Sequence, residues 1–138
     1  MKKIILAGAV TIALLVLGFI YFFHVSVKIN SDYDISDVSV IEENKNETKE
    51  SDRNFSHLAF SGVYTYRFIV KNGQDEVPVN VQVAKKSSFS HDNVSISVTN
   101  SDPNNKSIIT VDVYKDDVFA NGGTFDVAKD GRIVVKVD

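Results

Sequence analysis

The sequence predicts a small all-β domain, a two-layer antiparallel sandwich, behind one N-terminal transmembrane helix. Twenty consecutive residues near the start, Ile4 to Phe23, carry no charge. From Phe55 to Asp138, apolar residues recur at every second position between turn residues, which is the period of a sheet with one buried face. A polar, acidic segment separates these two regions, so we expect three parts: an anchor (1–27), a stalk (28–54) and a sandwich domain (55–138).

The uncharged segment has the length and the flanks of a membrane-spanning helix. A helix of this length extends about 30 Å, which matches the hydrocarbon core of a bilayer. Lys2 and Lys3 precede it, and Tyr21, Phe22 and Phe23 end it. Lysines favour the cytoplasmic side, and aromatic rings favour a membrane interface. These five residues are the predicted interface anchors, with the N-terminus cytoplasmic and the C-terminal domain extracytoplasmic.

The alternative for this segment is a cleaved signal peptide, after which the domain would be secreted. The apolar core of a signal peptide is about 7 to 15 residues long and ends at a small-x-small site. Here the run is longer, Ala7-Gly8-Ala9 comes too early, and Val25-Ser26-Val27 is a poor site. A retained anchor is therefore favoured. Lipidation of the bacterial lipoprotein type is excluded, because the chain has no cysteine.

The segment from residue 28 to residue 54 is acidic and poor in apolar residues. It holds eight acidic and four basic side chains, and 41–54 contains almost nothing that a core would bury. Such a composition predicts a flexible stalk, because too little apolar surface is present to offset chain entropy. A short strand over Ile35 to Val40 is a weaker expectation, since its apolar residues fit a period of two poorly.

The remaining residues predict about seven short strands. Tyr64, Tyr66 and Phe68 on the first strand are expected in the core. Asn72-Gly73 and Asp130-Gly131 favour tight hairpins, and Asn121-Gly122-Gly123 favours a further turn. Pro78 marks its strand as a candidate edge. The expected strands lie near 62–71, 75–85, 94–98, 109–113, 118–120, 124–129 and 132–138.

This pattern resembles a sandwich of the immunoglobulin or fibronectin type III kind, with a small open barrel as the alternative. The resemblance is one of architecture, because the chain lacks the Cys…Trp…Cys spacing of true immunoglobulin domains. A domain that lies outside the cytoplasm without disulfides fits a bacterial envelope better than a secreted animal protein.

Residues that carry chemistry are sparse, so we expect no enzyme, cofactor or metal. Cysteine nucleophiles and thiolate metal sites are excluded, and the three histidines have no ligand spacing. The loop around His91 has the composition of a catalytic triad, but neighbouring loop residues do not aim at one another easily. A hydrolase would require His57 and His91 to meet an acidic cluster in a cleft. The triad-like residues are Ser87, Ser88, Ser90, His91 and Asp92.

Acidic and amide side chains in the turns leave weak calcium binding open. Asp102, Asn104 and Asn105 supply the oxygen ligands that calcium prefers, as do the pairs Asp75-Glu76 and Asp116-Asp117. Asp and Asn are also preferred in turns for their own backbone hydrogen bonds, and this is the favoured interpretation. A nucleic-acid partner is disfavoured, because residues 55–138 hold nine basic against ten acidic side chains.

The function that these observations favour is a membrane-anchored, extracytoplasmic binding module of the cell envelope. Phe89, in the loop before the third expected strand, and Phe119, just before the Asn121-Gly122-Gly123 turn, are candidate contacts for a protein partner, since aromatic residues anchor interfaces. The alternative is a structural or accessory subunit of a membrane complex, in which the transmembrane helix makes the specific contacts.

Overall fold

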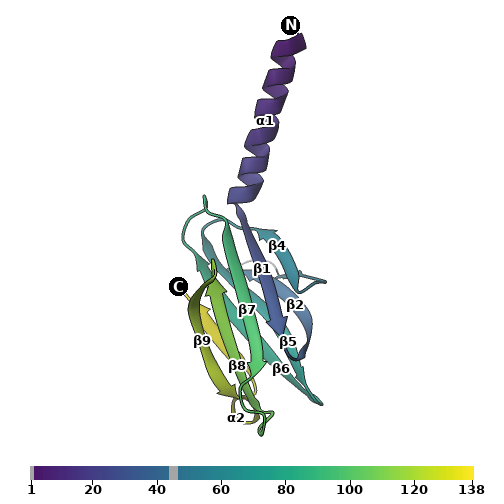
Figure 1. Ribbon diagram of the computed structural model, residues 1–138, viewed down its shortest axis with the longest axis vertical. Coiled ribbons are helices and arrows are strands. Elements are labelled where there is room, and N and C mark those ends of the chain that lie inside the picture. Colours follow the sequence, from purple (N-terminus) through teal and green to yellow (C-terminus); the bar gives the residue numbers. More distant parts are fainter. Residues whose placement is uncertain (1, 44–46) are drawn as a thin grey trace.

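A long helix, α1 (Lys2–Phe22), projects from one end of a two-layered β structure in the computed structural model (Figure 1). The structure describes residues 2–43 and 47–138, and it leaves out the side chains of residues 2–7 and 18–21. The predicted helix is thus present. Within the described residues, however, no helix combines the length and the hydropathy that crossing a membrane requires.

In the described part of the chain, ten strands form two five-stranded sheets, which confirms the predicted all-β sandwich (Figure 1). The first sheet has the order β4 (Asn54–Leu58), β1 (His24–Ser31), β7 (Asp92–Asn100), β8 (Ile108–Lys115) and β9 (Val118–Asp126). The second has the order β10 (Ile133–Val137), β6 (Asp75–Lys85), β5 (Gly62–Asn72), β2 (Asp34–Glu42) and β3 (Glu47–Lys49).

Side chains at alternate positions of the strands fill the space between the two sheets. The predicted core positions Tyr64, Tyr66 and Phe68 are all buried, and β6 contributes four valines from the same face. The hairpin between β5 and β6 is confirmed, with Gly73 at a φ of 65° in its turn. The period of two therefore identified the inner face of these strands correctly.

The predicted anchor boundary at residue 27 is wrong, because β1 begins at His24. Val25 and Val27 are each only 2% exposed and belong to the core, together with Ile29. β1 lies inside its sheet, antiparallel to β4 and parallel to β7. This strand is difficult to recognise in the sequence, because its first valines directly follow the apolar residues of the helix.

The predicted flexible stalk is also wrong for the described residues of 28–54. This segment contains the second half of β1, all of β2 and β3, and the first residue of β4, while residues 44–46 lie outside the described part. The weaker expectation of a strand near Ile35 to Val40 is confirmed as β2. A bulge with Asp37 at a φ of 55° places Val38, Ser39 and Val40 together in buried positions, which explains the poor period of two.

The predicted hairpin at Asp130-Gly131 does not form. Val127–Asp130 is a short helix, α2, which Asp126 caps at its start and Gly131 ends at a φ of 68°. The chain then crosses to the other sheet, where β10 runs parallel to β6. The fold is consequently mixed rather than purely antiparallel, since β1 and β7 form a second parallel pair. β6 is not an edge strand, although Pro78 lies just before the residues that pair with β10.

The predicted turn at Asn121-Gly122-Gly123 lies within strand β9. The hairpin between β8 and β9 instead turns at Asp116 and Asp117, both of which have positive φ. Gly122 lies opposite Asp112, and a Cβ there would come 2.6 Å from the carbonyl oxygen of Val111. Gly122 thus allows β8 and β9 to approach each other closely and does not form a turn.

We expect the segment 55–138 alone not to fold, because it lacks β1, β2 and β3. A fragment from His24 to Asp138 retains all ten strands and should unfold in one cooperative thermal transition by circular dichroism. The shorter fragment should show no transition. A cooperative transition in the shorter fragment would mean that the sandwich does not need β1.

Replacing Gly122 with alanine should lower the free energy of unfolding by about 1–3 kcal/mol, because the new methyl group meets backbone atoms of β8. Chemical denaturation of the His24–Asp138 fragment measures the change. Ala120→Ser in the same strand, at an exposed position, is the matched control and should stay within about 0.5 kcal/mol. Equal stabilities for both variants would contradict the close approach.

Candidate functional site

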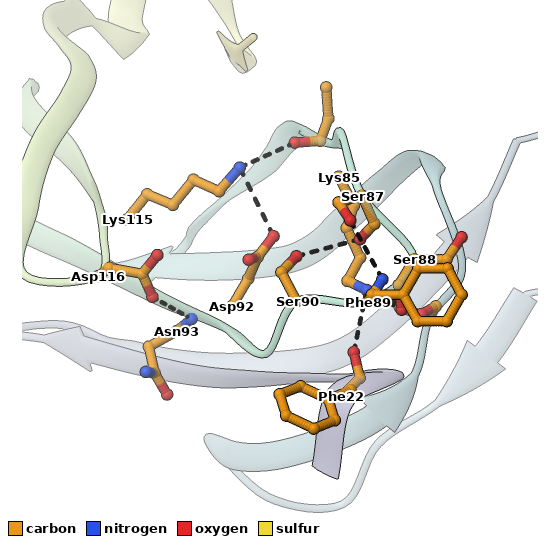
Figure 2. A network of polar contacts seen from close by, with 12 residues as sticks. Phe22, Lys85, Ser87, Ser88, Phe89, Ser90, Asp92, Asn93, Lys115 and Asp116 are labelled. Atoms are coloured by element: carbon orange, nitrogen blue, oxygen red, sulfur yellow. Dashed lines mark hydrogen bonds and ion pairs between the residues drawn. The ribbon is translucent and has the colours of Figure 1, made fainter. Parts of the chain in front are cut away.

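A buried lysine holds the end of α1 against the sandwich. Lys85, at the end of β6, is only 3% exposed. Its Nζ donates to the carbonyl oxygens of Ala59 at 3.1 Å, Ser88 at 3.4 Å and Phe22 at 3.5 Å. Figure 2 shows its bond to Phe22 at the end of the helix. Lys85 therefore joins α1, the β4–β5 loop and the β6–β7 loop.

The position of Lys85 explains both its burial and its charge. β6 points every second side chain inward from Val77 to Val83, and Lys85 is the next residue in that series. Burial lowers the pKa of the Lys85 ammonium, while the nearby Asp92 carboxylate raises it. A cation at the C-terminal end of a helix is also stabilised by the carbonyl groups there. The carbonyl oxygens thus offset part of the cost of burying this charge.

Asp92 and Lys115 form an ion pair beside Lys85. The Lys115 Nζ lies 3.5 Å from Asp92 Oδ2 and donates to the carbonyl oxygen of Ala84 at 3.1 Å. Asp116 Oδ1 accepts from the backbone N–H of Asn93 at 2.9 Å, which ties the β8–β9 turn to the start of β7 (Figure 2). These bonds order the helix-proximal end of the sandwich.

The triad-like residues of the β6–β7 loop are used in other bonds. Ser87 Oγ accepts from the backbone N–H of Phe89 at 3.2 Å, and Ser90 Oγ donates to the carbonyl oxygen of Ser87 at 3.0 Å. Ser88 Oγ accepts from the backbone N–H of Ser61. His91 Nε2 lies 3.2 Å from Ser26 Oγ on β1. These bonds order the loop and tie it to β1 and to the β4–β5 loop.

Aromatic rings cluster where α1 meets the sandwich. The ring of Phe23 has its centroid 5.3 Å from that of Phe60 and 5.3 Å from that of Phe89. Phe22 is 47% exposed, Phe60 45% and Phe89 76%. We call these four residues, Phe22, Phe23, Phe60 and Phe89, the aromatic collar. The predicted exposure of Phe89 is confirmed, whereas its contact with a protein partner stays a prediction.

The other predicted exposed aromatic residue lies on a different part of the molecule. Phe119, on the edge strand β9, is 56% exposed, and its ring packs edge-on against Tyr114 with centroids 5.8 Å apart. Val118 beside it is also exposed. Its exposure is confirmed, and its role as a partner contact stays a prediction. Of the predicted interface anchors, the side chains of Lys2, Lys3 and Tyr21 lie outside the described residues.

A pocket of about 370 Å³ lies near His57, between β4 and strands of the second sheet. Glu42, Glu50 and Tyr64 are among its lining residues, and His91 is not. Two acidic residues thus line a pocket with one of the predicted histidines. Within the described residues no three of the histidine and acidic side chains come close enough to hold a metal.

The hydrogen bonds of His57 indicate which nitrogen carries the proton in its neutral form. Its Nδ1 lies 3.2 Å from the carbonyl oxygen of Leu58 and therefore carries the proton. Its Nε2 then accepts from the hydroxyl of Tyr66 at 2.7 Å. Burial lowers the pKa of His57 from its ordinary value of 6.5, and burial also raises the pKa of Tyr66. A neutral imidazole and a neutral phenol fit this pair.

The candidate calcium ligands lie in ordinary turns. Asp102 Oδ1 accepts from the backbone N–H of Asn104 at 3.0 Å, and Asn105 Oδ1 accepts from that of Ser107 at 3.0 Å. These are the local bonds that favour Asp and Asn in turns. Calcium binding there stays untested.

Sequence reasoning missed Lys85 as the residue that joins the helix to the sandwich. The sequence contained a signal for this role, because Lys85 lies two residues after Val83 and so continues the inward-pointing positions of β6. A lysine at an inward position indicates a buried cation with specific acceptors. The His57–Tyr66 bond had no comparable signal, because its two residues belong to different sheets.

No protein-family model, curated protein or solved structure matches this chain. Its function is therefore inferred from the chemistry of its own residues.

Replacing Lys85 with methionine should destabilise the protein by about 1–3 kcal/mol, because buried carbonyl oxygens lose their donor. Denaturant unfolding of the His24–Asp138 fragment, which retains the acceptors Ala59 and Ser88, measures this change. Lys86→Met at the exposed neighbouring position is the matched control and should change stability by less than about 0.5 kcal/mol. Equal effects of both substitutions would show that the Lys85 bonds add nothing to stability.

Acid should destabilise the domain through His57. Above pH 6.5 the imidazole is neutral in both states; as the pH falls below 6.5, the unfolded chain binds the proton first, so the unfolding free energy falls. This loss ends once the pH passes the lowered pKa of the folded state. His24, Glu42 and Lys85 are the charged neighbours that modify the pKa of His57. His57→Gln should reduce the change of the melting temperature with pH between pH 7.5 and pH 5.5, roughly the range in which histidine titrates. An unchanged slope would contradict this role of His57.

Proposed function

We propose that this chain is a membrane-anchored, extracytoplasmic binding module of the cell envelope that acts without catalysis. The observation that carries the proposal is the direct connection between an apolar helix and a folded sandwich. Only Phe23 separates α1 from β1, and its carbonyl oxygen accepts from the backbone N–H of Ala59 at 2.6 Å. A domain attached in this way lies at the surface of whatever the helix enters.

The apolar surface of α1 supports a membrane as that environment. Consecutive side chains Leu14, Leu15, Val16 and Leu17 are each more than half exposed, and together they cover every side of the helix. A helix that is apolar all round is stable when buried in a large core or in lipid. The uncharged run Ile4 to Phe23, with Lys2 and Lys3 before it, supports the same proposal.

The start of β1 supports retention of the helix over cleavage. Processing at the poor signal site Val25-Ser26-Val27 would remove Val25 and Val27 from the core, where each is 2% exposed. Burial of a valine contributes about 1.5–3 kcal/mol, so a mature chain that starts after these residues would be weakened. The topology proposed from the basic start is a cytoplasmic N-terminus and an extracytoplasmic sandwich.

The surface near Phe119 is the proposed recognition surface. Phe119, Val118 and Tyr114 lie on the edge strand β9 and its neighbour β8. Exposed aromatic rings are enriched at the centres of protein interfaces, and an edge strand offers unpaired backbone groups to a partner. The likeness to immunoglobulin or fibronectin type III domains extends only to the sandwich architecture. This sandwich has two five-stranded sheets and two parallel strand pairs, which differs from the seven antiparallel strands of a constant-type immunoglobulin domain.

The second candidate function is an accessory subunit of a membrane complex, in which α1 makes the specific contacts. The same exposed apolar residues of α1 favour it, because partner helices could cover them. Replacing α1 with an unrelated apolar helix discriminates between the two functions. A binding module keeps its partner after the exchange, and an accessory subunit loses it.

Crosslinking capture from intact cells tests the leading proposal. The full chain and the His24–Asp138 fragment should capture the same envelope protein, and Phe119→Ala should reduce capture at least about tenfold, the effect of losing an interface hot spot. Val134→Ala, at an exposed apolar position of the other sheet, is the matched control and should leave capture unchanged. Capture by the full chain alone would favour the accessory subunit instead.

A further inference from the structure

The aromatic collar lies where the helix meets the sandwich and contains residues from three separate segments. Phe22 ends α1 and Phe23 follows it, Phe60 lies in the β4–β5 loop, and Phe89 lies in the β6–β7 loop. Leu58, which is 51% exposed, ends β4 next to the same loop. The rings of Phe60 and Phe89 pack against Phe23 although both are substantially exposed, as are Phe22 and Leu58. Scattered single apolar residues are normal on a surface, but a continuous exposed group indicates a contact.

The collar is held in place rather than left mobile. The Lys85 ammonium binds a carbonyl oxygen from each of the three segments that carry the rings. The hydroxyl of Tyr64 donates to the carbonyl oxygen of Phe60 and accepts from its backbone N–H, both at 2.9 Å. Figure 2 shows Phe22 and Phe89 with this network of bonds around Lys85. The rings therefore keep a defined position relative to the axis of α1.

The position of the collar along α1 corresponds to the edge of a bilayer. The uncharged run from Ile4 to Phe23 extends about 30 Å as a helix, so Phe23 would lie at the boundary of the hydrocarbon core. The rings of Phe60 and Phe89 have centroids only 5.3 Å from that of Phe23. Both rings would thus lie in the interfacial layer, where aromatic side chains are enriched.

We propose that the aromatic collar binds the phospholipid interface of the outer leaflet, so that the two loops carrying Phe60 and Phe89 insert beside α1 and fix the domain upright. The inference rests on the proposed membrane anchor and extends it to residues far from the helix in sequence. Lys86, exposed next to the collar, places a cation at the level of the lipid phosphates. Phe89 then faces lipid and not a protein partner.

Lipid is favoured over a second protein as the occupant because the collar continues the apolar surface of α1. Val16 and Leu17, which are exposed on α1, need the same apolar environment as the rings that follow them. The rings of the collar come from the helix end and from two loops beside it, so that one lipid surface can contact them together. Phe119 lies on the edge strand β9, where its ring packs against Tyr114.

The chain has no tryptophan, so single tryptophans can report the depth of each position. The full-length variants Phe60→Trp, Phe89→Trp, Phe119→Trp and Ile12→Trp are placed in phosphatidylcholine vesicles, with bromine either near the headgroup end or near the tail end of the acyl chains. Bromine quenches a nearby indole. Thermal unfolding by circular dichroism first checks that each variant is folded; the three phenylalanines are exposed, so substitution there should be tolerated.

Bromine near the headgroups should reduce the emission of the tryptophans at positions 60 and 89 at least about twofold, as expected for rings in the interface. The tryptophan at position 119 should keep its emission. The tryptophan at position 12 should be quenched by bromine near the tail ends, since Ile12 lies near the middle of the uncharged run.

Each other result overturns a defined part of the proposal. Quenching at position 12 without quenching at positions 60 and 89 leaves the anchor and rejects the collar. Absence of quenching at position 12 rejects the anchor itself, and the collar with it. Equal quenching at positions 89 and 119 shows that the domain lies flat on the membrane, which also rejects an upright collar. Blue-shifted emission at positions 60 and 89 without bromine quenching indicates a protein contact in place of lipid.

Discussion

β1 enters the sandwich one residue after α1 ends and pairs with strands on both sides, so the helix, its flanking loops and one sheet all depend on its burial. Val25, Val27 and Ile29 place one side of the strand in the core, while its backbone joins β4 to β7. Because no linker separates strand and helix, burial of β1 also sets where α1 leaves the domain. A flexible stalk would have left the orientation of the sandwich free.

Lys85 extends this constraint from the strand to the loops. A buried ammonium is costly unless acceptors replace its water, and here three carbonyl oxygens do so. Those carbonyl groups belong to segments that are far apart in sequence, so a single side chain connects three parts of the helix-proximal end. Asp92, which pairs with Lys115, also places a negative charge near Lys85. Hydrogen bonds and an ion pair thus stabilise this end of the sandwich, whereas apolar packing stabilises its middle.

The exposed aromatic residues fall into two groups with different surroundings. The collar lies against the end of α1, and the Tyr114–Phe119 pair lies on the edge strand β9 and its neighbour β8. If the first group contacts lipid, the second remains available to a partner in the envelope. Attachment and recognition would then use separate surfaces of one small domain. The direct connection of α1 to β1 would hold the recognition surface at a constant height above the membrane.

Local patterns in the sequence determined the helix, the β5–β6 hairpin and the inward positions of Tyr64, Tyr66 and Phe68, because periodicity and turn chemistry act over a few residues. The exposure of Phe89 and Phe119 was predictable in the same way. Only the tertiary structure decided that β1 and β2 belong to the sandwich, that Gly122 serves strand contact and that β10 crosses to β6. The residues that these strands and Gly122 contact are distant in sequence, so they are decided by burial and strand pairing in three dimensions. The same holds for the acceptors of Lys85.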